Sequence, residues 1–195
     1  LDIGGAGTAG AVTINEADAF DLVTGGLSFA VNDTVTLDLQ SEGTYLSSKL
    51  ASAGLTLGAL GNAQDGVGVD ILDIGGAGTA GAVTINEADV LDLINAGLSF
   101  AGNDQITLGL GEGADIEGTF LKTSSGGQVL LSSLGNGAEG VGVDVLDLFG
   151  QGTLTIDETD ALGLINAGLS FNTNDQITLD IQSEGTYLGS KLASA

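Results

Sequence analysis

The chain has 195 residues and a formal net charge of −23, which comes from 26 acidic residues set against three lysines. Cys and His are absent, so thiol and imidazole catalysts and zinc sites built on Cys or His lack their atoms. Three basic residues cannot supply the basic surface of a nucleic-acid binder, so we expect no nucleic-acid partner. Hydrophobic residues make up 43% of the chain, which is enough to form a core. No apolar run reaches the ~20 residues of a membrane helix, so we expect no membrane insertion.

An internal repeat is the strongest signal in the sequence. Residues 1–18 return unchanged at 72–89, and a variant with a shorter glycine loop opens the third part of the chain. We therefore divide the chain into one repeat at 1–71, a second at 72–145 and an incomplete third at 146–195, forming one continuous array. The sequence starts and stops inside a repeat. This pattern indicates an excerpt from a longer array, or a protomer whose ends are completed by neighbouring copies.

The first half of each repeat predicts two short strands and a helix. An apolar strand signal, VDILDI at 69–74 or VDVLDL at 143–148, is followed by a glycine loop and a short strand (AVTI or TLTI). A helix comes next, because an N-cap residue precedes Glu-x-Asp and then apolar residues spaced by three and four on one face. The N-cap positions are Asn15, Asn86 and Asp157, and a glycine ends each helix.

The second half predicts another strand and a weaker helix. Apolar residues alternate with Thr, Asp and Gln at 33–39, 104–110 and 175–181, which is a strand pattern. In the first repeat GTYLSSKLASAGL predicts a short helix, and in the second the insertion GEGADIE comes before that helix.

These elements together favour an α/β repeat solenoid of short parallel strands with short crossover helices. Strands joined by helical crossovers run parallel. One strand-helix unit cannot bury both faces of its sheet, whereas stacked units can. Compact modules joined like beads are the alternative, but no linker composition separates the copies.

Acidic residues recur at fixed places in the repeat and are candidates for binding a hard cation. Ca²⁺ takes oxygen ligands from Asp, Asn and backbone carbonyls in glycine-rich loops, and bound cations would relieve the self-repulsion of the chain. The competing interpretation is that Asn-Asp segments form turns and the other acids keep the surface soluble. Neither the EF-hand spacing nor the calcium-binding nonapeptide is present. The candidate Ca²⁺ ligands are Asp33, Asp38, Asp70, Asp73, Asp104, Asp144, Asp147, Asp175 and Asp180.

Catalytic interpretations are weaker, and we expect no enzyme. Paired carboxylates could serve a glycosidase, but here the acids repeat with the array, whereas an active site is normally unique. Ser and Thr nucleophiles have no His beside them, and Lys49 and Lys191 are typical of exposed cations near helix ends. Threonine rows on the strands raise an ice-binding alternative, although Gln105 and Gln176 interrupt them.

The segments GVGVDVLDL, NEADVLDLINAGLSF and NDQITLDI together resemble a repeat of very large bacterial cell-surface proteins. Such proteins are similar to biofilm-associated adhesins and S-layer-like proteins exported by type I secretion. The resemblance covers nearly the whole chain and implies an extracellular structural or adhesive role, often with calcium.

Our first hypothesis is therefore an extracellular structural repeat protein of a bacterial cell surface. Its copies would associate with one another end to end in a filament, stalk or surface layer, because open strand edges recruit partners. A calcium-dependent adhesin or binding module is the alternative, followed by an ice binder.

Overall fold

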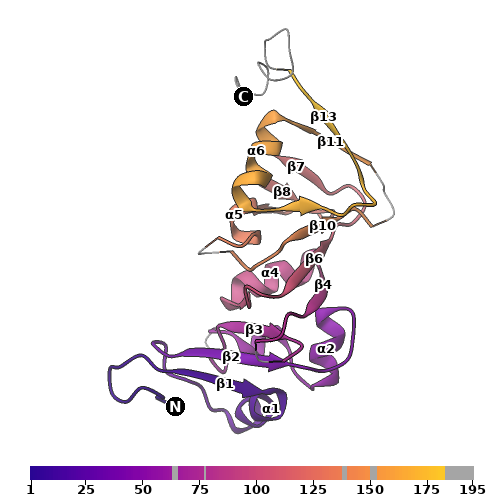
Figure 1. The fold of residues 1–195 in the computed structure, drawn as a ribbon. Coiled ribbons are helices and arrows are strands. Elements are labelled where there is room, and N and C mark those ends of the chain that lie inside the picture. Colours follow the sequence, from indigo (N-terminus) through magenta and orange to yellow (C-terminus); the bar gives the residue numbers. More distant parts are fainter. Residues whose placement is uncertain (63–65, 77, 138–139, 150–152, 183–195) are drawn as a thin grey trace. The chain divides into compact units, whose positions relative to one another are not determined.

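A computed structural model of the chain describes residues 1–62, 66–76, 78–137, 140–149 and 153–182 (Figure 1). It is a mixed α/β structure with parallel sheets and short helices. No helix within these described ranges is both long enough and apolar enough to cross a membrane. Contacts divide the chain into two compact units, Leu1–Thr107 and Leu108–Ala195, a division that falls inside the second repeat.

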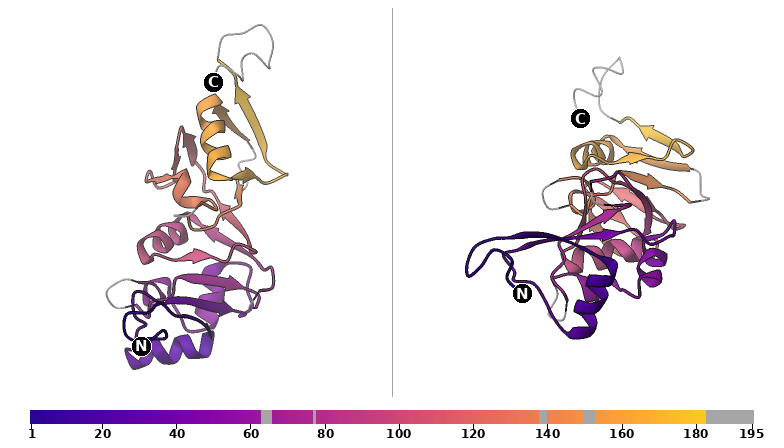
Figure 2. Two further views of the ribbon diagram at one scale, coloured as in Figure 1. Left: turned by 60° about the vertical axis from the view of Figure 1, so that its left-hand side comes forward. Right: turned by 60° about the horizontal axis from the view of Figure 1, so that its bottom comes forward.

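A four-stranded parallel sheet built from two repeats forms the centre of the first unit (Figures 1 and 2). The first repeat supplies β1 (Ala11–Asn15) and β2 (Thr34–Leu39). The sheet continues with β3 (Ile71–Ile74), which opens the second repeat, and with β5 (Ser99–Phe100) from inside it, in the order β1-β2-β3-β5. All neighbouring strands run parallel, as predicted. The sheet of one repeat is therefore completed by the next, which explains why the units and the repeats end at different residues.

Helices connect the strands of this sheet, which confirms the predicted crossovers. The chain passes from β1 to β2 through α1 (Glu16–Gly25), which packs against both strands. It passes from β2 to β3 through α2 (Leu46–Ser52), where the sequence predicts the weaker helix, and a one-turn helix, α3 (Leu57–Leu60).

Capping boxes begin the three longer helices at the predicted residues. The Asn15 side chain accepts a hydrogen bond from the Asp18 N–H at 2.9 Å, and the Asp18 carboxylate accepts one from the Asn15 N–H at 3.4 Å. The same reciprocal pair begins α4 (Glu87–Ala96) and α6 (Glu158–Ala167). A glycine with positive φ ends each helix, 62° at Gly26, a conformation that a residue without Cβ adopts at little cost.

The core of the first unit lies on one face of β2 and β3. Val35, Leu37 and Leu39 alternate along β2 and are fully buried, and Leu72 and Ile74 do the same on β3. Each such side chain contributes about 1.5–3 kcal/mol when it is removed from water. The alternation predicted from the sequence therefore identifies the core face correctly.

The pattern of β1 and β2 returns further along the chain. β4 (Ala82–Asn86) lies next to the start of β6 (Gln105–Gly109), and the Gln105 N–H donates to the Gly81 carbonyl at 2.8 Å. The matching residues of the first repeat make the same bond. The two repeats therefore fold alike at this point.

The second unit repeats parts of the same plan. β10 (Val145–Asp147) pairs in parallel with β12 (Ser170–Phe171), as β3 pairs with β5. β11 (Thr153–Asp157) pairs in parallel with β13 (Gln176–Asp180), as β1 pairs with β2, and α6 lies beside them (Figure 1).

An antiparallel sheet in the second unit contradicts one prediction. The helix expected after the GEGADIE insertion is absent from the described residues, and the chain instead forms β7 (Asp115–Glu117), β8 (Phe120–Lys122) and β9 (Gln128–Leu130). A single helical turn, α5 (Leu131–Leu134), follows. The physical reason is the segment KTSSGGQ, which replaces the helix-forming SSKLASA and contains Gly126 at a φ of 85°, so that it turns the chain back.

Candidate functional site

Three of the candidate Ca²⁺ ligands bind the backbone of the glycine loop. The two carboxylate oxygens of Asp104 accept hydrogen bonds from the N–H groups of Ile74 and Gly81, each at 2.8 Å. In the first repeat Asp33 accepts the matching two amides, those of Ile3 and Gly10, and in the third repeat Asp175 accepts the N–H of Leu148, the counterpart of Ile74. Ile74 ends a strand and Gly81 ends the loop, so this carboxylate fastens the two ends of the glycine loop together.

The hydrogen bonds at Asp33 also change its acidity. The N–H of Ile3 is the main cause that holds the pKa of Asp33 below its ordinary value; burial acts in the opposite direction, and the N–H of Gly10 adds to the lowering. At Asp89, in the first turn of α4, burial raises the pKa. Donation from the backbone of Asn86 opposes that rise and the charge of Asp92 adds to it.

Two further candidates fasten the start of a strand to a turn. Asp70 precedes β3 and accepts a hydrogen bond from the Val35 N–H at 2.8 Å and another from the Asn62 side-chain amide at 2.9 Å. Asp144 takes the same place before β10 and accepts one from the Asn136 amide at 2.6 Å. Both carboxylates thus accept hydrogen bonds from protein groups and hold neighbouring segments of the repeat together.

Asp38 and Asp73 differ from the other candidates because each has a buried oxygen without a hydrogen-bond partner. They are register partners on β2 and β3. One oxygen of Asp38 accepts from Gln40 Nε2 at 2.7 Å, and one oxygen of Asp73 accepts from the Gly78 N–H at 3.1 Å. The second oxygen of each, Oδ1, is buried and has no hydrogen-bond partner. The Asp73 residue is only 6% exposed, so this is an acidic pair set into the protein.

A hollow of about 270 Å³ opens beside Asp38, and most of the residues that line it are polar. Asp38 contributes a carboxylate to its lining, together with Asn15, Glu16, Ala17 and Gln40. Asn15 is the register partner of Asp38 on β1, so the polar row of the sheet runs from β1 through β2 to β3.

The last two candidates occupy the same row in later repeats. Asp147 takes the place of Asp73 and accepts a hydrogen bond from the Asn172 amide at 2.7 Å. Asp180 takes the place of Asp38 on β13 and is exposed. Across the described ranges, no three acidic residues lie together as a cluster that could hold a metal ion. The structure thus brings the candidates together only in a pair.

The sequence also predicts an exposed cation at Lys49, and that prediction is wrong. Lys49 is only 8% exposed, and its Nζ donates to the Ser41 carbonyl at 2.7 Å. Lys191 lies outside the described residues.

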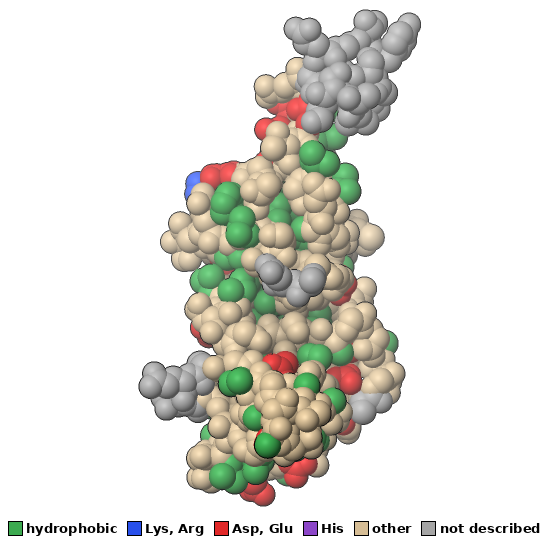
Figure 3. Space-filling view, turned by 90° about the vertical axis from the view of Figure 1, so that its left-hand side faces the viewer, with side chains coloured by type: hydrophobic (Ala, Val, Ile, Leu, Met, Phe, Trp, Pro, Cys, Tyr) green, Lys and Arg blue, Asp and Glu red, His purple; other side chains and the backbone are tan. Residues whose placement is uncertain are grey.

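Lys122 forms an exposed ion pair with Glu117 at 3.1 Å, and ion pairs of this kind stabilise a fold by ~1 kcal/mol at most. On the face drawn in Figure 3, apolar and acidic side chains are interspersed.

A second candidate site is the edge of β13. Among the described residues β13 pairs only with β11, whereas β2 has a strand on each side. Leu179 of β13 is 38% exposed, while its counterparts Leu37 and Leu108 are fully buried. Within the described residues, no strand therefore lies at the β13 edge in the place of the one that buries this position in the other repeats.

The first residues of the chain are the complement of this edge. Leu1 and Ile3 repeat Leu72 and Ile74 of β3, which are almost completely buried beside β2. Leu1 is 56% exposed and Ile3 is 44% exposed. The same apolar residues are therefore uncovered where no strand equivalent to β2 lies beside them in the described structure.

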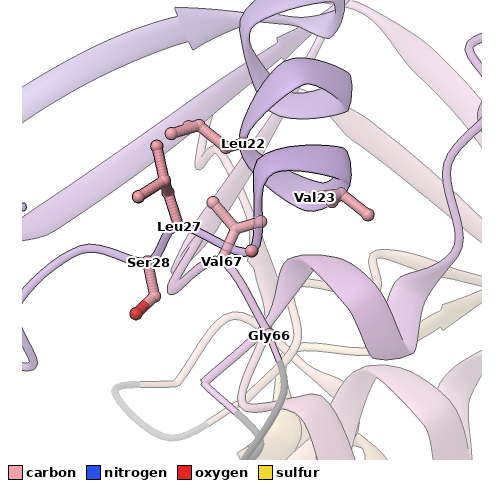
Figure 4. Close-up of a pocket in the computed structure, with 7 residues that line it drawn as sticks. Leu22, Val23, Leu27, Ser28, Gly66 and Val67 are labelled. Carbon is pink, nitrogen blue, oxygen red and sulfur yellow. The ribbon is translucent and has the colours of Figure 1, made fainter.

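A pocket of about 290 Å³ lies at the C-terminal end of α1 (Figure 4). Leu27 in its wall is 50% exposed, whereas its counterpart Leu98 is 2% exposed. At the matching end of α4 the preceding repeat is in contact, because the Asn62 N–H donates to the Ala96 carbonyl at 2.9 Å. The pocket is thus a surface that another repeat covers one step further along the chain. Its lining residues are Leu22, Val23, Gly26, Leu27, Ser28, Gly66 and Val67.

The sequence did not predict that the Phe149 ring lies beside Gly109, nor that the LSF segments at 98–100 and 169–171 pair as strands. Asp38 and Asp73 were found, but nothing local distinguishes them from the other acids. No protein-family model, curated protein or solved structure matches the chain. Its own residues and their geometry alone bear on what it does.

Proposed function

We propose that this chain is an extracellular structural repeat protein whose repeats stack as an α/β solenoid and whose copies associate end to end. The observation that carries the proposal is strand sharing: β3 and β5 complete a sheet that β1 and β2 of the preceding repeat begin. A repeat that needs strands from its successor presents a surface made for another repeat. Nearest-neighbour contacts of this kind are what hold solenoids together.

Contacts behind the sheet support the stacking. The Thr84 N–H on β4 donates to the Thr44 carbonyl of the preceding repeat at 2.9 Å. Gly61 approaches α4 so closely that a Cβ built there would lie 2.2 Å from the Ala96 carbonyl oxygen. Two consecutive repeats therefore meet through backbone groups as well as through side chains.

The same geometry defines a junction between two copies. The exposed edge of β13 in one copy would receive the first residues of a second copy as its missing strand. The register of β2 and β3 sets the expected pairs, because the residues repeat. They are Leu179 with Leu1, Asp180 with Asp2 and Ile181 with Ile3. This contact is head to tail, so repetition produces a filament or stalk, and lateral packing of such filaments a surface layer.

The proposed location is a bacterial cell surface. It is supported by the resemblance to large cell-surface repeats and by a composition without the sulfur-containing side chains that oxidants attack. The second candidate function, a calcium-dependent adhesive module, is favoured by the two buried oxygens of Asp38 and Asp73 that have no donor.

The association is tested by sedimentation velocity over a range of concentrations and by electron microscopy of the concentrated protein. We expect the 195-residue chain to form species that grow with concentration and appear as fibres. Leu179→Lys places a charge in the proposed junction, and because Leu179 is partly exposed already, the monomer should stay folded. The matched control is Ile165→Lys on α6, which changes a 73% exposed side chain outside the β13 edge.

The Leu179→Lys chain keeps the first residues that act as the incoming strand. Added to the wild-type chain, it should therefore occupy free β13 edges and stop growth, so that the fibres shorten. A wild-type chain that stays monomeric at high concentration would contradict the proposal. So would equal association of the Leu179→Lys and Ile165→Lys variants with the wild-type chain.

A further inference from the structure

We propose that Asp38 and Asp73 bind a hard divalent cation, Ca²⁺, between β2 and β3. The two carboxylates are register partners on adjacent parallel strands, so they project from the same face of the sheet. Strands in a sheet lie ~4.8 Å apart, a separation that one cation can bridge with oxygens at ~2.3–2.6 Å from it.

The buried oxygens are the observation that points to a ligand. Asp38 Oδ1 and Asp73 Oδ1 are both inaccessible to solvent and without a hydrogen-bond donor. Buried side-chain acceptors in proteins almost always have a partner. Two neighbouring carboxylates also repel each other, and removal from water strengthens that repulsion. A cation between them supplies the missing partner for both oxygens and cancels the repulsion.

The corresponding position further along the chain, formed by Gly109 of the second repeat and Asp147 of the third, is a natural comparison. It lacks the acidic pair, and among the described residues it has no buried oxygen without a partner. Gly109 replaces Asp38, and the Phe149 ring fills the space, since a Cβ at Gly109 would lie 1.9 Å from the ring. Asp147 keeps the place of Asp73 but accepts a hydrogen bond from Asn172, where the second repeat has Ala101. At Asp147 the hydrogen-bond partner is therefore a protein group, the Asn172 amide. At Asp38 and Asp73, in our proposal, a cation takes that role.

Ca²⁺ fits the donors better than Mg²⁺ does. Ca²⁺ takes six to eight oxygens in a flexible geometry, whereas Mg²⁺ demands a near-ideal octahedron. The pair offers two carboxylate oxygens and no third acid, so water would complete the shell. The hollow of about 270 Å³ beside Asp38 has room for that water.

A corollary rests on the proposed head-to-tail function. Asp180 takes the place of Asp38, and Asp2 takes the place of Asp73. End-to-end association would bring them together at the junction and build a second copy of the site there. The site between β2 and β3 lies within one unit and does not depend on this corollary.

The test measures Ca²⁺ binding by calorimetry and the melting temperature in Ca²⁺ and in EDTA. All proteins carry Leu179→Lys and are measured at low concentration, so that association between copies contributes nothing. Asp38→Asn and Asp73→Asn remove one charge without changing shape. Asp147→Asn is the matched control, because it removes the same charge from the corresponding position of the third repeat.

We expect Ca²⁺ to raise the melting temperature of the parent chain and of Asp147→Asn. We expect Asp38→Asn and Asp73→Asn to lose at least about tenfold in Ca²⁺ affinity. Substitution of residues that only hydrogen-bond to metal ligands already lowers metal affinity by about tenfold or more, and Asp38 and Asp73 are proposed as direct ligands. In EDTA these two variants should melt at or above the parent temperature, since the repulsion is gone, which shows that they fold. The proposal is overturned if Ca²⁺ leaves the parent chain unchanged, or if Asp147→Asn weakens binding as much as Asp73→Asn does.

Discussion

The carboxylate of Asp104 joins both ends of the glycine loop after β3, and Asp104→Ala tests how much of the fold depends on that bond pair. The substitution removes the acceptor for the N–H groups of Ile74 and Gly81, both at 2.8 Å. Ile74 is 1% exposed, so water cannot readily replace the lost oxygen at its amide. Both amides would remain without their acceptor in the folded protein.

The expected loss follows from these two bonds. A hydrogen bond to a charged group stabilises a protein by about 1.5–3 kcal/mol. Two bonds to one carboxylate are not independent, and Gly81 is only half-buried, so we expect a loss of about 3–5 kcal/mol in the free energy of unfolding. Small domains have about 5–15 kcal/mol in total. The variant should therefore be near the limit of stability.

Urea denaturation followed by circular dichroism measures this loss, and Asp33→Ala is the matched control. Asp33 makes the same two bonds, to Ile3 and Gly10, at 2.9 and 2.8 Å. The segment that it holds is exposed, so its release should scarcely change the main unfolding transition. The reasoning is refuted if Asp104→Ala costs under about 1 kcal/mol, the range of ordinary surface changes, or if the two variants lose stability equally.

Two further predictions concern the repeat contact and the glycine loop. Gly61→Ala should lower the free energy of unfolding, measured in urea, by about 1–3 kcal/mol, because the new Cβ overlaps the Ala96 carbonyl. The control is Gly58→Ala, which has open space around it and should not lower the free energy of unfolding. Equal losses in the two variants would contradict the close contact at Gly61. The Asp33 pKa is depressed in the fold, so its stabilisation of the loop is present above the unfolded carboxyl value of ~3.9 and is lost as pH falls through the lower folded value. The NMR shift of the Ile3 amide should titrate with a midpoint below ~3.9, and a midpoint at or above it would contradict this assignment.

Most helices and parallel strands of this protein could be predicted from the sequence, because their signals are local. Asn15 and Asp18 lie in one turn of chain, so a capping box can be predicted from their spacing alone. The alternation of Val35, Leu37 and Leu39 identifies a buried strand face for the same reason. The antiparallel sheet at 115–130 was not predicted, since its strands are only three residues each and carry little periodic signal.

Only the tertiary structure decided which repeat completes which sheet and which acids have donors. Both Asp73, beside a glycine loop, and Asp104, in an Asn-Asp segment, are conspicuous acids in the sequence. The partners of Asp104 lie 30 and 23 residues away, and both of its bonded oxygens prove to be occupied. Asp73 lies beside Asp38 across two strands that are joined through two helices. Hydrogen-bond satisfaction depends on groups that meet only when the chain folds, so no spacing in the sequence could separate a structural carboxylate from a candidate cation ligand.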